Sequence, residues 1–574
     1  MTFASTRSLH VHHRRNCSDA LKTRDRCISR DIMFPRIPSK ILFEKLTALQ
    51  ARNRQLSQRA MQSFIRASRS WPASRTNFRS QHAGKRTLLH RQLSSQSAQH
   101  DESSPLFHAL APKPTIDVKH IRQHPELYSQ NCVDRNYQSQ KQAPFRIQQA
   151  FAQWQQSQAD ARSLRERNNA LQGQLKTLAS SNDGAAESQR SGILEEAKAL
   201  KQRLSNVVLQ EDRLLAEMQD LAYRLPNLTS KETPIGGEPR LIKYINPSTE
   251  TSTSSSRVTR SHVEIGERLQ ILDWAAARTA SGTGWYFLVN EGAMLEQALI
   301  QYALSIAMKR GWKIVSPPSM VYSHIVSACG FLPRDQSGEQ QIYTISQSIK
   351  DRGKPEYSLT GTAEIPLAAM KANETLREEQ LPFKVIGTSR CYRAEAGARG
   401  VQSKGLYRVH EFSKVEMFAW TGRDKITGND ISASSSPSAT ILQEMVDIQT
   451  TILESLNLRC RVLEMPSYDL GGSAFRKQDI EAYFPSRRDV DQGWGEVTSA
   501  SICTDYQTRR LATRLEGPKG DAKSWPYTVN GTAMAVPRVI AAILENGWDE
   551  ERGVVHIPEV LRPWMGGSEV IERK

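Results

Sequence analysis

Residues 387–418 read GTSRCYRAEAGARGVQSKGLYRVHEFSKVEMF, and this stretch says more about the function of the chain than any other. It contains a Gly-rich, basic turn. The flanks FKVIGTSRCYRAE (383–395) and YRVHEFSKVEMFAW (407–420) alternate and are rich in β-branched and aromatic residues. This pattern predicts two strands joined by a long loop. Because alternate side chains of a strand share one face, the two strands are expected to line one surface with charge.

The charged residues of this predicted hairpin suit the recognition of a nucleotide and an amine. Arg393 offers a planar guanidinium for a phosphate. Glu395, Glu411 and Glu416 offer carboxylates for amines, and Phe412 offers a ring face for a base. An ordinary surface hairpin has no need of an arginine and three glutamates at such positions, so the pattern favours a binding site.

The length and composition of the chain narrow its class. A chain of 574 residues has room for about three or four domains. Its seven cysteines are scattered without a CxxC pair, which argues against a disulfide framework and against a structural zinc site. No run approaches eighteen apolar residues, so no membrane span is expected.

The net charge of +17 is concentrated near the N-terminus. Residues 1–100 hold 20 of the 77 Lys and Arg but 4 of the 60 Asp and Glu, which leaves 57 basic and 56 acidic residues elsewhere. An Arg-rich, Ser-rich and acid-poor segment is typical of an organellar transit peptide. A basic tail that binds RNA is the alternative. We expect a mitochondrial address in residues 1–100, with Met33 and Met61 as alternative starts that leave a cytosolic form open.

A long helical hairpin is predicted between Pro144 and Arg224. The seam of the first helix is Ala161, Leu164, Asn168, Leu171, Leu175 and Leu178, and that of the second is Ile193, Ala197, Leu200, Leu204, Val207, Leu214, Met218, Leu221 and Leu225. A narrow apolar seam surrounded by charge is typical of a coiled coil, and the polar turn between the two halves makes the pair antiparallel. Such a pair can serve as a spacer, a dimerisation element or an arm that binds a partner.

Several further segments follow in the C-terminal half. Residues 284–321 predict a strand, a long amphipathic helix and a second strand. The segments LTGTAEIPLAAM (359–370), GEVTSASICTDYQTRR (495–510) and YTVNGTAMAVPRVIAAILENGW (527–548) combine acids, hydroxyls and arginines at the ends of predicted strands and helices. The sequence lacks GxxxxGK[ST] and GxGxxG motifs, so P-loop and Rossmann nucleotide sites are not supported.

Together these segments resemble the seryl-tRNA synthetase family of class II aminoacyl-tRNA synthetases. The hairpin at 387–418 resembles motif 2, residues 284–321 resemble motif 1, and residues 527–548 resemble motif 3. The resemblance covers about residues 115–570. It implies an α+β fold, with an antiparallel catalytic sheet flanked by helices and preceded by the coiled-coil hairpin. The expected organisation is a targeting segment (1–100), an N-terminal tRNA-binding arm domain (113–228), a linker (229–261) and a catalytic domain (262–574).

The resemblance also assigns roles to individual residues. The expected catalytic residues are the arginines of motifs 2 and 3, Arg393 and Arg538. The expected L-serine ligands are Thr362, Ala363, Glu364, Glu416, Asn530 and Thr532. The expected ATP ligands are Arg393, Ala394, Glu395, Val409, Phe412, Glu496, Val497, Thr498, Ser499 and Arg538. Thr532 stands where many family members have serine, which keeps the hydroxyl and adds a methyl group.

The implied reaction is the activation of L-serine with ATP and its transfer to tRNA(Ser) for mitochondrial translation. Glu496 and Ser499 are expected to hold Mg²⁺ together with ATP, because Mg²⁺ prefers one or two carboxylates plus phosphate oxygens. The resemblance implies a homodimer and no membrane partner. A non-catalytic paralogue that binds RNA or a protein, and a ligase that charges a carrier protein, are the alternatives.

Overall fold

The computed structural model describes residues 111–178, 184–247, 259–331, 341–351, 353–394, 405–423, 436–517 and 524–574. The predicted targeting segment (1–100) and Glu395 lie outside these ranges. Within them, no helix combines the length and the apolar character needed to cross a membrane.

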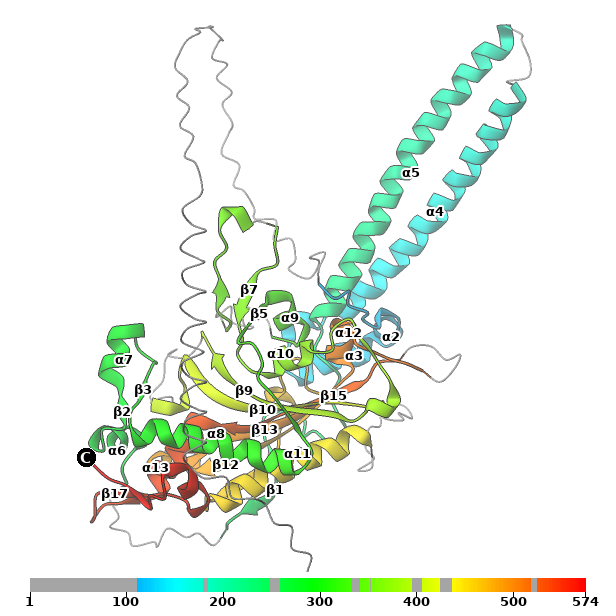
Figure 1. Cartoon of the computed structure of the whole chain (residues 1–574). Coiled ribbons are helices and arrows are strands. Elements are labelled where there is room, and N and C mark those ends of the chain that lie inside the picture. Colours follow the sequence, from blue (N-terminus) through cyan, green and yellow to red (C-terminus); the bar gives the residue numbers. More distant parts are fainter. Residues whose placement is uncertain are drawn as a thin grey trace, which may run out of the picture. The chain divides into compact units, whose positions relative to one another are not determined.

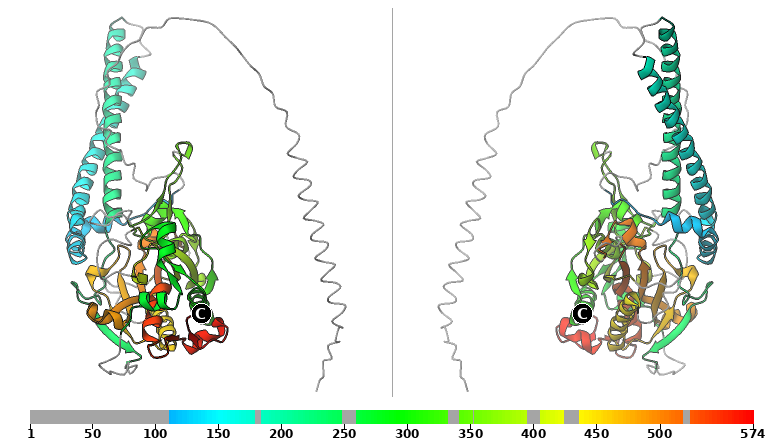
Figure 2. Two further views of the ribbon diagram at one scale, coloured as in Figure 1. Left: turned by 90° about the vertical axis from the view of Figure 1, so that its left-hand side faces the viewer. Right: turned by 90° about the vertical axis from the view of Figure 1, so that its right-hand side faces the viewer.

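The N-terminal domain is helical, and its main feature is the predicted hairpin. Its helices are α2 (Val118–Gln123), α3 (Pro125–Asp134), α4 (Ala143–Leu178) and α5 (Gly184–Arg224). At 1.5 Å per residue, the 36 residues of α4 span about 54 Å. Figures 1 and 2 show α4 and α5 running side by side along their length.

The seam between α4 and α5 is the one that the sequence predicts. Ala161, Leu171 and Leu200 are buried, whereas the charged side chains beside them are exposed. Arg167 pairs with Glu196 and Arg146 pairs with Glu217 across the two helices, at 2.8 and 2.7 Å. These pairs fix an antiparallel register, so the prediction of a coiled-coil hairpin is confirmed.

Eight strands of the described residues form the main sheet, in the order β1-β11-β12-β13-β15-β10-β9-β4. β4 pairs parallel with β9, and the other neighbours in this sheet pair antiparallel (Figure 1). The predicted α+β class is therefore correct. The bounds are β1 (Arg240–Ile245), β4 (Lys313–Val315), β9 (Phe383–Tyr392), β10 (Glu411–Thr421), β11 (Cys460–Glu464), β12 (Arg476–Tyr483), β13 (Trp494–Thr504) and β15 (Tyr527–Ala535).

The position of β1 corrects one expectation. Residues 229–261 were expected to form a linker, but Arg240–Ile245 pairs with β11 at the edge of the main sheet. Five of the six residues of β1 are exposed. An exposed edge strand has no buried face to impose an alternating pattern, so its sequence gives a weak strand signal.

Three long helices, α8 (Glu291–Lys309), α11 (Pro437–Ser455) and α13 (Val536–Asn546), cover one face of this sheet. Alternation along β10 separates the two faces: Val415 and Met417 join the core beneath these helices, whereas Phe418 and Trp420 join a second core on the opposite side. That second core also includes residues of α9 (Ser323–Ala328) and α10 (Glu364–Ala369). The sheet is thus buried on both sides and provides a rigid support for side chains near its centre.

Shorter elements complete the described chain. The helices are α6 (His262–Arg268), α7 (Trp274–Ser281) and α12 (Tyr506–Arg510). The strands are β2 (Leu272–Asp273), β3 (Phe287–Leu288), β5 (Met320–Tyr322), β6 (Thr344–Ile345), β7 (Tyr357–Leu359), β8 (Thr375–Leu376), β14 (Arg514–Leu515), β16 (Trp548–Asp549), β17 (Val554–His556) and β18 (Val570–Ile571).

The hairpin predicted from residues 387–418 is formed by β9 and β10. Glu411 lies opposite Tyr392, and Glu416 lies opposite Gly387. β10 also pairs with β15, with a register shift between Val415 and Glu416. This arrangement places the end of β9 beside the start of β10, and the middle of β10 between the middle of β9 and the middle of β15.

Candidate active site

A cavity of about 120 Å³ lies where three strands of the sheet meet the start of α13. Because β10, β15 and β13 are neighbours, side chains that are distant in sequence converge there. The predicted ATP and serine ligands that line the cavity are Arg393, Val409, Phe412, Glu496, Thr498, Ser499, Thr532 and Arg538.

Arg393 follows the last residue of β9. Its backbone N–H donates to the carbonyl of His410 at 2.9 Å, which holds it against the start of β10. Its guanidinium carbon lies 5.3 Å from the centre of the Phe412 ring, within the range of a cation–π contact. Arg393 and Phe412 therefore form one wall of the cavity, with a positive charge beside an aromatic face.

Arg538 and Glu496 form a second wall. Arg538 comes from α13, and its guanidinium donates to the carboxylate of Glu496 at 3.1 Å, to the Glu496 carbonyl at 2.9 Å and to the Tyr407 carbonyl at 3.2 Å. Burial raises the pKa of Glu496, but the charges of Arg538, Lys477 and Arg393 outweigh burial and hold it below its usual value. Glu496 is thus a carboxylate at neutral pH, in a region of positive charge suited to a polyphosphate.

Acidic and hydroxyl side chains gather next to this cavity. Glu416 is 1% exposed on β10 and accepts a hydrogen bond from the Thr532 hydroxyl of β15 at 3.1 Å. The Lys414 ammonium lies 2.7 Å from the same carboxylate. Glu364, the first residue of α10, is 6% exposed, and the charge of Glu416 acts on it. Two buried carboxylates and a hydroxyl are the groups needed to bind the ammonium and the side chain of serine.

Glu364 is held in place by polar neighbours. The Gln507 amide donates to its carboxylate at 2.6 Å, and a side-chain hydrogen bond from Asn530 also reaches it. Burial and, to a smaller extent, the charge of Glu416 raise the pKa of Glu364 to about 8. Lys414, Gln507 and Asn530 act in the opposite direction. At neutral pH this carboxyl is therefore largely protonated until a cation arrives.

The remaining predicted residues lie around the cavity and the acidic cluster of Glu364 and Glu416. The Thr362 hydroxyl accepts from the backbone N–H of Glu364 at 3.2 Å, and Ala363 is fully buried just before α10. The Val497 side chain belongs to the hydrophobic core, so it faces away from the cavity. Ala394 donates its N–H to the Gln341 carbonyl at 3.1 Å. Glu395 lies outside the described residues, so its predicted contact stays a prediction.

Two residues of the site, Lys414 and Gln507, have no role that the sequence predicted. Lys414 stands two positions before Glu416, so the period of a strand could have placed it on the same face. Gln507 was noted in the 495–510 segment without a partner, because its contact with Glu364 joins residues 143 positions apart. Long-range contacts of this kind leave no periodic signal in a sequence.

No group of three or more His, Cys, Asp or Glu side chains in the described ranges is arranged to hold a metal ion. Glu496 and Ser499 both line the cavity. One carboxylate and one hydroxyl suit a cation that takes its other ligands from phosphates and water.

The chain matches two models of protein families. Residues 115–229 match the seryl-tRNA synthetase N-terminal domain, and residues 343–547 match the tRNA synthetase class II core domain (G, H, P, S and T). The fold and the site thus define a class II aminoacyl-tRNA synthetase.

Individual relatives make the assignment more specific. The mitochondrial serine–tRNA ligase of Saccharomyces cerevisiae is 40% identical over 376 residues, which cover 65% of this chain and 78% of the relative. The serine–tRNA ligase of Rhodopirellula baltica is 35% identical over 79% of this chain and 98% of its own length. The crystal structure of seryl-tRNA synthetase from Pyrococcus horikoshii complexed with ATP is 28% identical, with a TM-score of 0.68 over 80% of this chain and all of that one. The chain belongs to the seryl-tRNA synthetase family.

Proposed function

We propose that this chain activates L-serine with ATP to form seryl-adenylate and then transfers the seryl group to the 3′ end of tRNA(Ser). The observation that carries the proposal is the position of Glu364, Glu416 and Thr532 beside the cavity of Arg393 and Arg538. An amine site next to a polyphosphate site is the arrangement that amino-acid activation needs.

Serine binds at the acidic end of the site. Its ammonium pairs with Glu364 and Glu416, and its hydroxyl forms hydrogen bonds with polar neighbours such as Thr532. Thr362, Ala363 and Asn530 complete this pocket. Since a buried site built to hydrogen-bond a hydroxyl leaves polar groups unpaired when the hydroxyl is missing, alanine binds far less well.

ATP binds at the basic end of the site. The adenine lies against Phe412 and Val409, with its amino group near Glu395 and the backbone of Ala394. Residues 496–499 and Arg538 bind the triphosphate, with Arg538 at the γ-phosphate. Arg393 binds the α-phosphate.

The first chemical step is an in-line displacement. A carboxylate oxygen of serine attacks the α-phosphorus, and the bond to the bridging oxygen breaks with release of pyrophosphate. Arg393 stabilises the negative charge that develops on the α-phosphate, and no proton has to move in this step. The catalytic contribution of the chain is therefore positioning and charge stabilisation.

The site would take Mg²⁺ together with ATP. Glu496 and Ser499 are the side chains that would hold it, and their exposure in the cavity fits this role. The ion supplies charge neutralisation at the phosphates.

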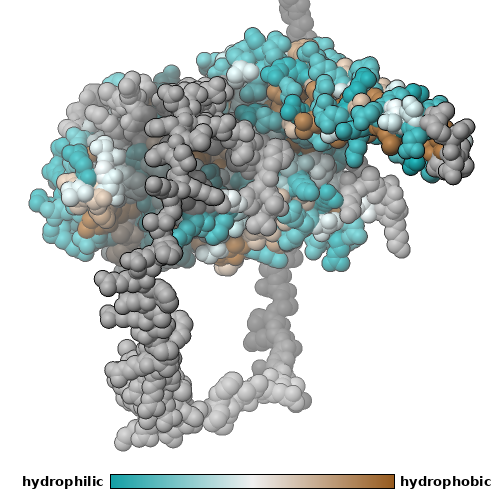
Figure 3. Space-filling view, turned by 90° about the horizontal axis from the view of Figure 1, so that it is seen from above, coloured by the Kyte–Doolittle hydropathy of each residue, from teal (hydrophilic) through white to brown (hydrophobic). Residues whose placement is uncertain are grey.

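In the second step, the terminal hydroxyl of tRNA(Ser) attacks the carbonyl carbon of seryl-adenylate and AMP leaves. The arm formed by α4 and α5 binds the body of the tRNA. Its exposed cations are suited to phosphates: Arg162, Arg165, Arg167, Lys176, Arg190, Lys198, Lys201 and Arg203. Hydrophilic residues also predominate among the described residues on the face shown in Figure 3. The arm therefore recognises the shape of the RNA and its phosphates more than its bases.

We also propose that the chain forms a homodimer. Large apolar side chains are about half exposed on β3, α8, β4 and β5: Phe287 (48%), Met308 (55%), Ile314 (51%) and Met320 (49%). Met308 and Ile314 lie on α8 and on the edge strand β4, which contact each other, and exposed apolar groups at a sheet edge favour association with a second copy. Analytical ultracentrifugation should show twice the mass of the monomer.

Residues 1–100 indicate the cellular compartment in which the protein acts. The mitochondrial relatives and the basic, acid-poor composition of this segment support import into the mitochondrial matrix. A reporter fused to residues 1–100 should accumulate in mitochondria, and one fused to residues 111–210 should stay in the cytosol.

Aminoacylation tests the proposed function. Purified protein, ATP, Mg²⁺ and labelled serine should convert a tRNA(Ser) transcript to acid-precipitable seryl-tRNA. A tRNA(Ala) transcript under the same conditions is the control. Failure to charge tRNA(Ser), with a protein that is folded by circular dichroism, would contradict the proposal.

A further inference from the structure

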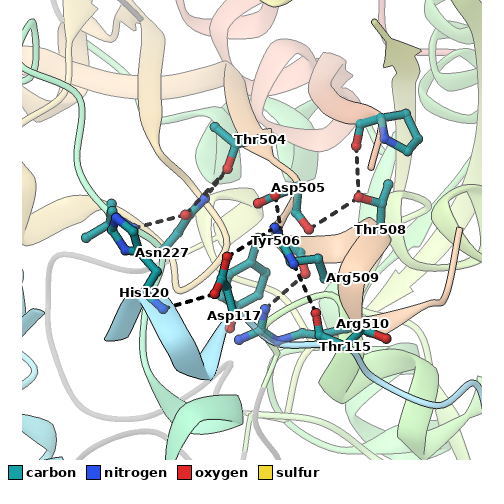
Figure 4. Close-up of polar contacts among 12 residues, drawn as sticks. Thr115, Asp117, His120, Asn227, Thr504, Asp505, Tyr506, Thr508, Arg509 and Arg510 are labelled. Carbon is teal, nitrogen blue, oxygen red and sulfur yellow. Dashed lines mark hydrogen bonds and ion pairs between the residues drawn. The ribbon is translucent and has the colours of Figure 1, made fainter. Parts of the chain in front are cut away.

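Helix α12 touches the serine site on one side and the N-terminal domain on the other. It has five residues, Tyr506–Arg510, and follows directly on β13. Figure 4 shows the polar contacts around it. The residues that make these contacts come from the start of the described chain, from the end of the arm and from the main sheet. Neither the proposed reaction nor the arm's binding of RNA explains why these contacts converge on one short helix.

The contact with the serine site is made by Gln507. Its side chain is fully buried, and its amide nitrogen donates to Glu364 at 2.6 Å. Its amide oxygen accepts from the Thr528 hydroxyl at 2.6 Å. Because both ends of the amide are engaged, the orientation of Gln507 is fixed, and its donor is directed at the carboxylate.

The contacts with the N-terminal domain are made by the last two residues of α12. The Arg510 guanidinium is 4% exposed, donates to the Tyr223 carbonyl at 2.9 Å and lies 3.3 Å from the centre of the Tyr506 ring. Arg509 donates to the Thr115 carbonyl at 3.2 Å, and its own carbonyl accepts from the Thr115 N–H at 2.8 Å.

The strand that leads into α12 is anchored in the same way. The Asn227 amide, just beyond the arm, donates to the Cys503 carbonyl at 2.9 Å and to the Thr504 hydroxyl at 3.0 Å. A cavity of about 690 Å³ lies at this junction, lined by residues of both domains. Specific hydrogen bonds, more than continuous packing, therefore set the position of α12 against the N-terminal domain.

We propose that Gln507 is a positioning residue for the proposed serine ligand Glu364, and that the N-terminal domain sets its position by holding α12 through Arg510. The proposal rests on the function proposed above. It implies that the affinity for serine depends on contacts at the base of the arm even when no tRNA is present.

The groups around Glu364 make the role of Gln507 measurable. Burial and the charge of Glu416 raise the pKa of Glu364, whereas Lys414, Gln507 and Asn530 lower it. The thiols of Cys329 and Cys503 lie near the same carboxylate and are themselves buried. Removing the hydrogen-bond donor at position 507 should therefore raise the pKa of Glu364, so that serine binds only at a higher pH.

The test uses serine-dependent ATP–pyrophosphate exchange, which needs no tRNA, with the full chain. Gln507→Met keeps the length of the side chain and removes both hydrogen bonds. It should raise the KM for serine about tenfold, as expected for a lost hydrogen bond to a charged group, and leave the KM for ATP unchanged. The acid limb of kcat/KM for serine should shift to higher pH. Arg510→Met should raise the KM for serine severalfold in the same assay.

Thr508→Val is the matched control. Thr508 is a buried residue of the same helix, and its hydroxyl donates to the Pro526 carbonyl at 2.8 Å, away from Glu364. This variant is expected to lose stability without a change in the KM for serine. If Thr508→Val raises that KM as much as Gln507→Met, α12 has a structural role only and the proposal is wrong.

Glu364→Gln separates this proposal from the proposed function. If Glu364→Gln leaves the KM for serine unchanged, the serine site itself is misassigned. If Glu364→Gln raises it and Gln507→Met does not, the site stands and the positioning role is refuted. If Gln507→Met raises it and Arg510→Met does not, the dependence on the N-terminal domain is refuted.

Discussion

The ammonium of Lys414 lies 2.7 Å from the carboxylate of Glu416, two residues further along β10, and both side chains are buried. Lys414 thus compensates one of two acids that share a small, buried region. Lys414→Met should destabilise the protein by about 3 kcal/mol, because it leaves a buried charge unpaired. Urea unfolding measures this change. Lys371→Met, which breaks the more exposed pair between Lys371 and Glu374, is the control and should cost less than about 1 kcal/mol.

The raised pKa of Glu364, about 8, predicts a pH dependence of serine binding. Because the carboxylate binds the ammonium and the protonated acid does not, kcat/KM for serine should rise with pH and level off above about pH 8. The ratio of wild type to Glu364→Gln cancels the ionisation of serine itself. This ratio should increase across the same range, and a ratio that is constant with pH would show that Glu364 does not titrate on binding.

Arg393 is predicted to act on the chemical step. Arg393→Lys keeps the charge but loses the planar fork, so the rate of adenylate formation should fall about a hundredfold, with little change in the KM for serine. Arg390→Lys is a matched control three residues earlier, on β9, because Arg390 is 47% exposed and pairs with Glu296 outside the cavity. Single-turnover measurements of adenylate formation compare the two. Equal losses in both variants would contradict the assigned role of Arg393.

Arg135 is predicted to hold the N-terminal domain against the sheet. It is 1% exposed and donates to the carbonyls of Asn227 and Ala474 at 2.7 and 2.8 Å. Arg135→Met should cost about 3 kcal/mol of unfolding free energy, since several buried carbonyls lose their donor. Arg146→Met removes an exposed pair in the same domain and should cost less than about 1 kcal/mol. Similar losses for both variants would contradict this account.

A shortened arm separates tRNA binding from amino-acid activation. The pairs Arg146–Glu217 and Arg167–Glu196 set the register, so residue 156 lies opposite residue 207. Replacing residues 157–206 by a short Gly-Ser turn keeps Ile147, Met218 and the cluster around them. Aminoacylation of tRNA(Ser) should then fall by at least a hundredfold, as several phosphate contacts are lost, while pyrophosphate exchange persists. Undiminished aminoacylation would show that the arm does not bind the tRNA.

The sequence predicted those elements of the fold in which apolar residues recur at a regular spacing. The seam of Ala161, Leu171 and Leu200 was predicted because apolar residues recur at helical spacing, and the strands around Arg393 and Glu416 were predicted because they alternate and are rich in β-branched and aromatic residues. The edge strand Arg240–Ile245 was missed because it has little buried face. Periodicity therefore identified the elements at the centre of the fold and failed at its margin.

For the site, the residue types were predictable but their mutual contacts were not. The segments 359–370, 495–510 and 527–548 point to Glu364, Glu496, Thr532 and Arg538 as polar groups at the ends of elements. The pairing of Lys414 with Glu416 and the hydrogen bond from Gln507 to Glu364 depend on strand register and on the docking of α12. Both are tertiary features that a single sequence does not encode locally.

Serine-dependent ATP–pyrophosphate exchange by the purified chain tests the central claim most directly, because it needs only the sheet, its two carboxylates and its two arginines. The account predicts rapid exchange with serine and exchange reduced by at least a thousandfold with alanine, since the buried polar groups of the pocket would lose their partner. Absence of exchange with serine, or equal exchange with alanine, would contradict it and favour a chain that keeps the fold without the reaction.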